Sequence, residues 1–266
     1  MNDTYTGGYP GIAGQRVIVT AGAAGIGLAT ARAFRDAGAK VEICDTDAEA
    51  LAALAQSDPD IGASQADVAE PDEVARFFEA AIGRLGGLEV LVNNAGIAGP
   101  TSPIESCDFE GWQRTLAVNL DGQFLCTRLA VPLMKAAKRG AVVNLSSAAG
   151  VHGFPLRAPY ATAKWGVIGL TKTLAMELGP WNIRVNAICP GPVEGPRIDR
   201  VIKADAASRG LEEAEVRDAY LKQTSMRVFV SADDIAHMIL FICSDAGARI
   251  SGQALSVDGH TERLGI

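Results

Sequence analysis

The sequence predicts an α/β fold: a single domain built on a doubly wound parallel sheet with helices on both faces. Short, continuously apolar runs alternate with longer segments of helical periodicity, which is typical of repeated β-α-β units in a parallel sheet. Right-handed crossovers then distribute the helices over both faces. The 266 residues, 48% of them hydrophobic, suffice for one large core, and no internal repeat or second domain interrupts the pattern.

Each element is predicted from its own residues. The run RVIVT (16–20) is a buried strand, and the segment after it has helical spacing and a terminal glycine. Pro71 suits the first turn of a helix, and Ser231 suits an N-cap. The further strands expected are 40–45, 62–68, 88–96, 140–147, 183–191 and 253–259, and the helices expected are 25–39, 46–56, 71–87, 108–138, 159–179 and 231–245.

The composition argues against several classes of partner. The formal net charge of −7 disfavours nucleic acid, whose phosphates need a basic face. No stretch reaches the ~18 consecutive apolar residues of a membrane helix. Residues 1–13 have an acid and no apolar core, so we expect a flexible arm rather than a signal peptide. The five cysteines lack metal or redox spacing, which predicts reduced thiols, no metal site and a cytoplasmic protein.

A glycine-rich turn, VTAGAAGIG, joins the first strand to the first helix. Gly22, Gly25 and Gly27 let the backbone turn sharply and approach a ligand, and the N–H groups that open the helix, at Ile26 and its neighbours, then face a pyrophosphate. Glycine also serves ordinary turns. This cluster, however, follows a strand and opens a helix, as the dinucleotide-binding motif requires.

An acidic residue ends the second strand. The carboxylate of Asp45 would accept hydrogen bonds from the adenosine ribose hydroxyls and would repel a 2′-phosphate, and the glycine turn contains no Lys or Arg. We therefore expect NAD in preference to NADP. The alternative is that Asp45 or Thr46 only caps the next helix, although Asp47 could also do so.

Further motifs stand in order along the chain: D-V at 67–68, NNAG at 93–96, Asn119, SSAAG at 146–150, Y-x-x-x-K at 160–164 and PGPV at 190–193. With the glycine turn, they make the sequence resemble the short-chain dehydrogenase/reductase family of the classical type, over about residues 14–259. The resemblance implies a seven-stranded Rossmann sheet over 14–266, a substrate lid at about 192–228, and a homotetramer.

The resemblance also implies roles for individual residues. Ser147 would hold the substrate oxygen, and Asn119 would hold a water near Lys164 in a proton relay. The residues implied to contact the cofactor are Asp67, Val68, Asn94, Ala95, Gly96, Tyr160, Lys164, Pro190, Gly191 and Val193. Two departures stand out: the family has a glycine where this chain has Ala21 followed by Gly22, and often a threonine at about Gly195.

The spacing of Tyr160 and Lys164 carries the chemistry. Residues four apart on a helix lie on nearly the same face, so the ammonium stands close to the phenol. A free phenol has a pKa near ~10 and is a poor base, but a nearby cation favours the phenolate. Such a phenol can take the hydroxyl proton of an alcohol while hydride leaves the same carbon for the cofactor.

Three cationic or titratable residues are candidates for contact with substrate. Arg157 precedes Tyr160 by three residues, Arg197 opens the expected lid, and His152 lies in the loop before Tyr160. Guanidinium groups facing one pocket would suit an anionic substrate. Alternatively, these arginines pair with Glu194, Asp199 or Asp205 on the surface.

The sequence thus predicts an NAD-dependent oxidoreductase that interconverts a secondary alcohol and a ketone, on a small molecule that could be anionic. One alternative is a reductase of 3-oxoacyl thioesters that uses NADPH; Asp45 and the net acidity disfavour it. Another is a non-catalytic dinucleotide sensor, which the presence of both Tyr160 and Lys164 disfavours.

Overall fold

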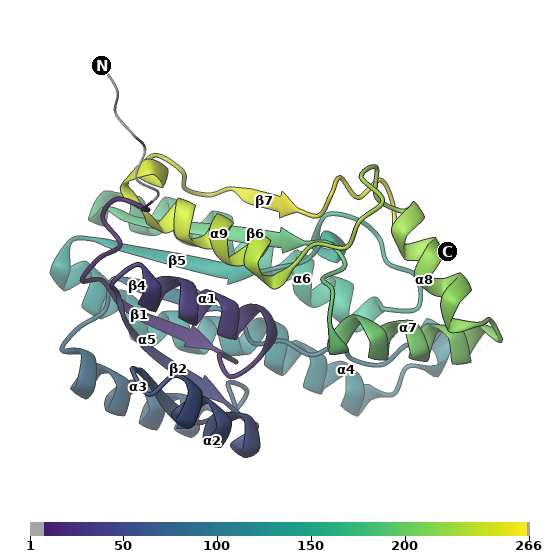
Figure 1. The fold of residues 1–266 in the computed structure, drawn as a ribbon, viewed down its shortest axis with the longest axis horizontal. Coiled ribbons are helices and arrows are strands. Elements are labelled where there is room, and N and C mark those ends of the chain that lie inside the picture. Colours follow the sequence, from purple (N-terminus) through teal and green to yellow (C-terminus); the bar gives the residue numbers. More distant parts are fainter. Residues whose placement is uncertain (1–7, 265–266) are drawn as a thin grey trace.

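The computed structural model describes residues 8–264, and its centre is one parallel sheet of seven strands in the order β3-β2-β1-β4-β5-β6-β7 (Figure 1). The order runs in both directions from β1, which confirms the doubly wound parallel sheet. The strands are β1 (Arg16–Thr20), β2 (Lys40–Asp45), β3 (Ile61–Gln65), β4 (Val90–Asn93), β5 (Gly140–Leu145), β6 (Ile183–Pro190) and β7 (Ala254–Val257).

Helices cover both faces of the sheet, so that the strands are buried on both sides (Figure 1). One core contains side chains of α1, α2 and α9 over the sheet, and a second contains side chains of α3, α5 and α6 under it. The helices are α1 (Gly25–Asp36), α2 (Ala48–Ser57), α3 (Pro71–Leu85), α4 (Phe109–Leu116), α5 (Gly122–Ala137), α6 (Ala158–Leu178), α7 (Pro196–Arg209), α8 (Glu213–Lys222) and α9 (Ala232–Cys243).

Local sequence explains where these helices begin. The carboxylate of Asp47 accepts the backbone N–H groups of Glu49 and Ala50, so Asp47 is the N-cap of α2, and Asp45 lies outside the helix. Pro71 occupies the first turn of α3. Ser231 and Asp234 form a reciprocal capping box at the start of α9.

One expected element differs from the structure. The segment 108–138 is not a single α-helix, because a π-helical turn, Ala117–Asp121, separates α4 from α5. Gly122, the residue after this turn, packs so closely on the loop after β3 that an added Cβ would lie 2.7 Å from Cγ2 of Val68. Asn119 lies at the centre of the π-helical turn and is fully buried.

The two chain segments outside the regular pattern also have defined contacts. Of the expected arm, residues 1–7 lie outside the described residues; in the remainder, Ile12 is fully buried and Pro10 accepts a backbone hydrogen bond from Asp245. The charged segment 192–228 contains α7 and α8, whose apolar side chains form a small separate core around Ile202 and Tyr220.

No helix of the described part of the chain is long and apolar enough to cross a membrane. Among residues 8–264, no group of three or more His, Cys, Asp or Glu side chains is arranged to hold a metal ion. Four of the five cysteines are buried and all five are free thiols.

Candidate active site

The candidate site lies at the carboxyl ends of β1, β4, β5 and β6, where a ligand binds in an open α/β sheet. The parallel register brings Asn93 of β4 opposite Asn144 of β5, and Leu145 of β5 opposite Ile188 of β6. The loops that follow these strands therefore meet above one edge of the sheet. They carry most of the residues that the sequence analysis singled out.

Tyr160, Lys164 and Ser147 come together at this edge. Tyr160 and Lys164 lie one turn apart on α6, and Nζ of Lys164 is 5.6 Å from the centroid of the Tyr160 ring. The same ammonium donates a hydrogen bond of 2.8 Å to the carbonyl of Leu145, at the end of β5. The hydroxyl of Ser147, two residues farther on, lies near the phenol of Tyr160 and lowers the pKa of that phenol. The four-residue spacing predicted that Tyr160 and Lys164 lie close together, whereas the place of Ser147 was implied by the family resemblance.

The charges around Tyr160 favour its phenolate. Burial alone would raise the pKa of this phenol, but the ammonium of Lys164, followed by Arg197, the Ser147 hydroxyl and Arg157, brings the pKa below its ordinary value. Burial in turn lowers the pKa of Lys164 to about 8, against the opposing effect of Tyr160. The site can therefore exchange a proton at a lower pH than a free phenol.

The π-helical turn aims the side chain of Asn119 at the same place. Its Nδ2 donates to the carbonyls of Ile97 and Thr115, at 3.0 and 2.9 Å, and its buried Oδ1 has no hydrogen-bond donor among the described residues. A Cβ at Gly96 would lie 2.7 Å from that Oδ1 and 3.4 Å from Nζ of Lys164. Gly96 thus keeps free the space beside both groups.

The glycine turn has the shape that a pyrophosphate needs. Gly25 has a φ of 53°, and an added Cβ at Gly27 would lie 2.1 Å from the carbonyl oxygen of Ala21. The N-cap residue, Ala24, offers no side chain to the first N–H groups of α1, including that of Ile26. These groups fit an anionic phosphate at the helix N-terminus.

Asn94 holds this turn in place. Its Nδ2 donates to the carbonyls of Thr20 and Ala21, at 2.9 and 3.0 Å. In return, the hydroxyl of Thr20 accepts the backbone N–H groups of Asn94 and Ala95, both at 2.9 Å. Thr20 was expected only as part of the glycine turn, and these hydrogen bonds of its hydroxyl were not predicted. The position of Thr20 as the last residue of β1 is the feature that could have indicated them.

Two acidic residues, Asp45 at the end of β2 and Asp67 just after β3, lie at the carboxyl ends of these strands. Asp45 Oδ2 accepts the N–H of Ala23 at 3.1 Å, which ties the carboxylate to the glycine turn. Asp67 forms an ion pair of 2.5 Å with Arg114 and accepts the N–H of Ala69. Val68, beside it, is buried against Gly122.

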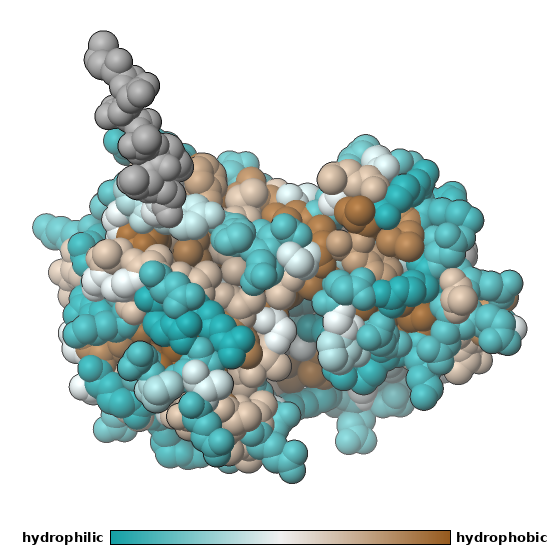
Figure 2. Space-filling model, in the orientation of Figure 1, coloured by the Kyte–Doolittle hydropathy of each residue, from teal (hydrophilic) through white to brown (hydrophobic). Residues whose placement is uncertain are grey.

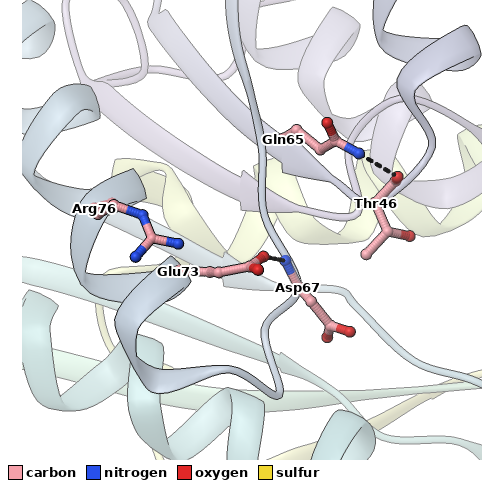
Figure 3. A pocket seen from close by; sticks show the side chains of 5 residues that line it. All are labelled: Thr46, Gln65, Asp67, Glu73 and Arg76. Carbon is pink, nitrogen blue, oxygen red and sulfur yellow. Dashed lines mark hydrogen bonds between the residues drawn. The ribbon is translucent and has the colours of Figure 1, made fainter.

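A cavity of about 410 Å³ opens beside these carboxylates (Figure 3). Its lining residues are Thr46, Gln65, Asp67, Glu73 and Arg76. Glu73 accepts the N–H of Asp67 at 2.8 Å, and Gln65 donates to the carbonyl of Thr46 at 3.1 Å, so the wall is hydrogen-bonded (Figure 3). Polar groups of both charges line this space, and Thr46, one of them, directly follows Asp45 in the chain.

The segment after β6 lies close to β7 and then leads into the charged segment 192–228. A Cβ at Gly191 would lie 2.8 Å from Cα of Asp258, so only glycine fits there after Pro190. Val193 pairs with Val230 in an isolated bridge. Gly195, at the N-cap of α7, has a φ of 133° and provides no side-chain cap.

The three substrate candidates are placed differently. Arg157 is buried beside Tyr160, with its guanidinium carbon 5.8 Å from the ring centroid. Arg197 is exposed on the first turn of α7 and acts electrostatically on Tyr160 and Lys164. His152 is half-buried in the loop before α6, and its carbonyl accepts the indole N–H of Trp165.

The alternative ion pairs for these arginines do not form. Glu194 and Asp199 both pair with Arg217 of α8. Asp205 is buried and accepts the hydroxyl of Tyr220 at 2.6 Å.

Three buried polar contacts behind the site escaped the sequence analysis. Asn93 donates to Asn144 at 2.9 Å, and Asn144 donates to Thr171 of α6 at 2.9 Å. Ser146 donates to the carbonyl of Lys164 at 2.8 Å, and a Cβ at Gly150 would lie 2.2 Å from Ser146 Oγ. These contacts fix α6 against β5, and only their polar character within apolar strands could have indicated them.

Comparisons relate the chain to known proteins. A family model described as "Enoyl-(Acyl carrier protein) reductase" matches residues 21–260. The chain is 35% identical to the D-beta-hydroxybutyrate dehydrogenase of Rhizobium meliloti (strain 1021), over 92% of this chain and 97% of that protein. It is 39% identical to the trans-4-hydroxycyclohexanecarboxylate dehydrogenase of Sinomonas cyclohexanicum, over 92% of each chain.

A third relative and a solved structure are also similar to this chain. The chain is 34% identical to the 3-oxoacyl-(acyl-carrier-protein) reductase FabG of Thermotoga maritima, over 92% of this chain and 97% of that protein. Among solved structures, levodione reductase matches with a TM-score of 0.87 and 30% identity, over 93% of this chain and 97% of that one.

Proposed function

This chain belongs to the short-chain dehydrogenase/reductase family and is an NAD(P)-dependent oxidoreductase that interconverts secondary alcohols and ketones; from this premise we propose that Tyr160 is its acid/base group and NAD its cofactor. The observation that carries the proposal is the phenol of Tyr160, held against the Ser147 hydroxyl and the Lys164 ammonium.

In the oxidation direction, Tyr160 takes the proton of the substrate hydroxyl. Ser147 holds the same substrate oxygen by a hydrogen bond and so orients the carbinol carbon. When bound, the nicotinamide ring supplies the hydride acceptor for that carbon. Lys164 stabilises the phenolate before the transfer, and Asn119 holds a water that links Lys164 to solvent. In the reduction direction, Tyr160 returns the proton to the carbonyl oxygen.

Three features of the structure support a dinucleotide at this edge. The uncapped N-terminus of α1 suits the pyrophosphate, and the cavity beside Asp67 and Val68 suits the adenine. The carboxylate of Asp45, which lies next to the glycine turn, suits two ribose hydroxyls and opposes a 2′-phosphate. This charge supports NAD over NADP. Asn94, Ala95, Gly96 and the residues Pro190, Gly191 and Val193 would flank the nicotinamide half.

We extend the proposal to the lid, the assembly, the location and the substrate of the protein. The charged segment 192–228, with α7 and α8, is a lid that closes over the substrate. The protein acts as a homotetramer in the cytoplasm. Residues 14–266 form the catalytic unit, and residues 1–13 precede it. Two relatives are named for hydroxy carboxylates, which supports a small hydroxy acid as the substrate.

A dehydrogenase screen tests the proposed function. The purified protein is assayed by the formation of NADH with hydroxy acids, polyols and secondary alcohols, and each hit is repeated with NADP⁺. We expect Tyr160→Phe to lower kcat/KM by about 10²- to 10⁴-fold, the usual range for loss of a general acid/base, while NADH binding, measured by fluorescence, persists.

Three results would contradict the proposal. Full activity in Tyr160→Phe would remove Tyr160 from the mechanism. A tenfold or larger preference for NADP⁺ would remove the assigned role of Asp45 and favour the alternative 3-oxoacyl thioester reductase. Tight NADH binding without turnover of any substrate would favour a dinucleotide sensor.

A further inference from the structure

Arg157 carries a buried positive charge that the mechanism above does not use. It is 4% exposed and is the one arginine among the described residues that is classed as buried. Its Nη1 donates to the hydroxyl of Thr101, and its buried Nε has no acceptor. No carboxylate of the described part of the chain forms an ion pair with it.

Three buried carboxylates of the described residues do have a counter-ion. The carboxylates of Glu42, Asp58 and Glu89, each about 5% exposed, all hold at least one arginine. A buried charge that lacks a counter-ion lowers stability, because neither water nor an opposite charge solvates it. The buried carboxylate of the lid, Asp205, is engaged by the hydroxyl of Tyr220. Arg157 is thus a cation for which residues 8–264 supply no ion-pair partner.

Arg157 lies between Tyr160 and the side chains that pack against the lid. Its guanidinium carbon lies 5.8 Å from the centroid of the Tyr160 ring and 5.6 Å from that of Phe154. Phe154 in turn packs against the small core of α7 and α8, around Ile202 and Tyr220. On the face seen in Figure 2, a groove separates the lobe of α7 and α8 from the body of the molecule.

We propose that Arg157 binds the carboxylate of a short hydroxy acid whose carbinol carbon lies at Tyr160, and thereby selects acids over neutral alcohols. This inference rests on the proposed function. The planar guanidinium suits a carboxylate, which accepts two parallel N–H groups, and Nε is an unused donor. The short separation between Arg157 and Tyr160 favours an acid with few carbons between its carboxylate and its hydroxyl. Closure of the lid excludes water and strengthens the pair.

Paired substrates test this selectivity. The assay uses 2-, 3- and 4-hydroxy acids of four to six carbons, each beside its methyl ester, which keeps the hydroxyl and removes the charge. We expect the wild type to prefer the acid of at least one pair. We expect Arg157→Met to lower the acid-to-ester ratio of kcat/KM by roughly 10- to 150-fold, as for a charge-assisted hydrogen bond, and added guanidinium to restore part of it.

Two control variants separate this role from a structural one. Arg200→Met removes an exposed arginine of the same lid and leaves the ratio unchanged. Thr101→Val removes only the hydroxyl that Nη1 contacts, and it also leaves the ratio unchanged. An equal loss for acid and ester in Arg157→Met, or the same fall in ratio in Thr101→Val, would mean that Arg157 only tethers a loop and would overturn the proposal.

A binding measurement keeps the test independent of turnover. The melting temperature of the NADH-bound protein is recorded with acetate, butanoate, hexanoate and the corresponding methyl esters. We expect stabilisation by a carboxylate in the wild type and in Arg200→Met, and none in Arg157→Met. If no carboxylate stabilises the wild type, the inference fails even where neutral alcohols are oxidised. If carboxylates bind but no alcohol is oxidised, the proposed function fails instead.

Discussion

Ala21 shows that a residue type can change while the backbone conformation stays. The family pattern has glycine at this position, and Ala21 keeps a φ of 50°, in the left-handed region that glycine favours. Gly22 meets a different need, because an added Cβ would lie 2.5 Å from Cβ of Ile43. The glycine turn therefore keeps a left-handed residue at position 21, although that residue is alanine and not glycine.

We predict that Ala21→Gly stabilises the protein. Relief of left-handed strain, about 1–2 kcal/mol, exceeds the added flexibility of the unfolded chain, about 0.4–1 kcal/mol. The net gain of roughly 0.5–1 kcal/mol is measured as a shift of the urea unfolding midpoint. Gly22→Ala is the opposing control and destabilises through its contact with Ile43. A destabilised Ala21→Gly protein would show that the turn bears no strain at this residue.

The pair Tyr160 and Lys164 predicts how oxidation depends on pH. Because the phenolate is the reactive form and its pKa lies below the ordinary value, kcat/KM for oxidation rises with pH through that pKa and then levels off. Removal of the ammonium in Lys164→Met leaves the phenolate less stabilised, so the acidic limb moves to higher pH. The measurement is kcat/KM against pH for both proteins. An unmoved limb would mean that Lys164 does not tune the phenol.

Residue patterns predicted only part of this site. The i,i+4 spacing of Tyr160 and Lys164 fixes their meeting within one helix, so the sequence could predict it. The burial of Arg157 depends on Phe154 and on the packing of α7 and α8, which lie far along the chain. Long-range packing of this kind has no local pattern, so the sequence predicted Arg157 as a candidate for an anionic substrate but not its burial.

At the scale of elements, the break between α4 and α5 was the feature that periodicity missed. Apolar spacing through 108–138 predicts one helix, and no proline or inserted glycine pair marks the π-helical turn at 117–121. The turn instead follows from tertiary contacts, including the close approach of Gly122 to Val68. Such turns are frequent at functional sites, and here it directs Asn119 inward. The order of strands and helices, set by strong apolar runs, was correctly predicted.

An element-scale prediction concerns the opposite end of the sheet. Glu89, just before β4, accepts the N–H and side chain of Arg16 in β1 and pairs with Arg139 beside β5, at 3.0 Å. Because one buried carboxylate joins three strands, we expect Glu89→Gln to destabilise the protein by about 3 kcal/mol. Asp218→Asn, in an exposed ion pair with Lys222, should cost less than ~0.5 kcal/mol. Urea unfolding at neutral pH measures both.

The carboxylate of Glu89 also predicts how the stability of the protein depends on pH. Burial would raise the pKa of Glu89, but hydrogen bonds from Arg16 and Arg139 lower it to about 2. A depressed carboxyl pKa contributes stability above its unfolded value of about 4.3 and loses it as the pH falls toward the folded value. The stability difference between wild type and Glu89→Gln should therefore shrink between pH ~4.3 and ~2. A difference that stays constant over this range would exclude the charge as its source.

At the scale of the whole molecule, the helices α4, α5 and α6 are apolar beyond what the sheet needs. Large apolar side chains remain exposed on them, including Phe109 on α4, Phe124 on α5, and Trp165 and Met176 on α6. Met176 is 82% exposed. Exposed apolar patches of this kind are typical of protein–protein interfaces. A second copy of the same chain could cover these side chains without any other protein. The proposed tetramer would bury them in this way.

We predict that the wild type sediments as a particle of about four times the 27.7 kDa of one chain. Phe124→Glu places a charge in a patch that association would bury, so it shifts the particle toward smaller species at the same protein concentration. Ala53→Glu, on the exposed side of α2, introduces the same charge away from this patch and leaves the assembly unchanged. Analytical ultracentrifugation over a range of concentrations distinguishes the three proteins. A wild type that remains a monomer throughout would exclude the tetramer, and an unaltered assembly in Phe124→Glu would place its interface elsewhere.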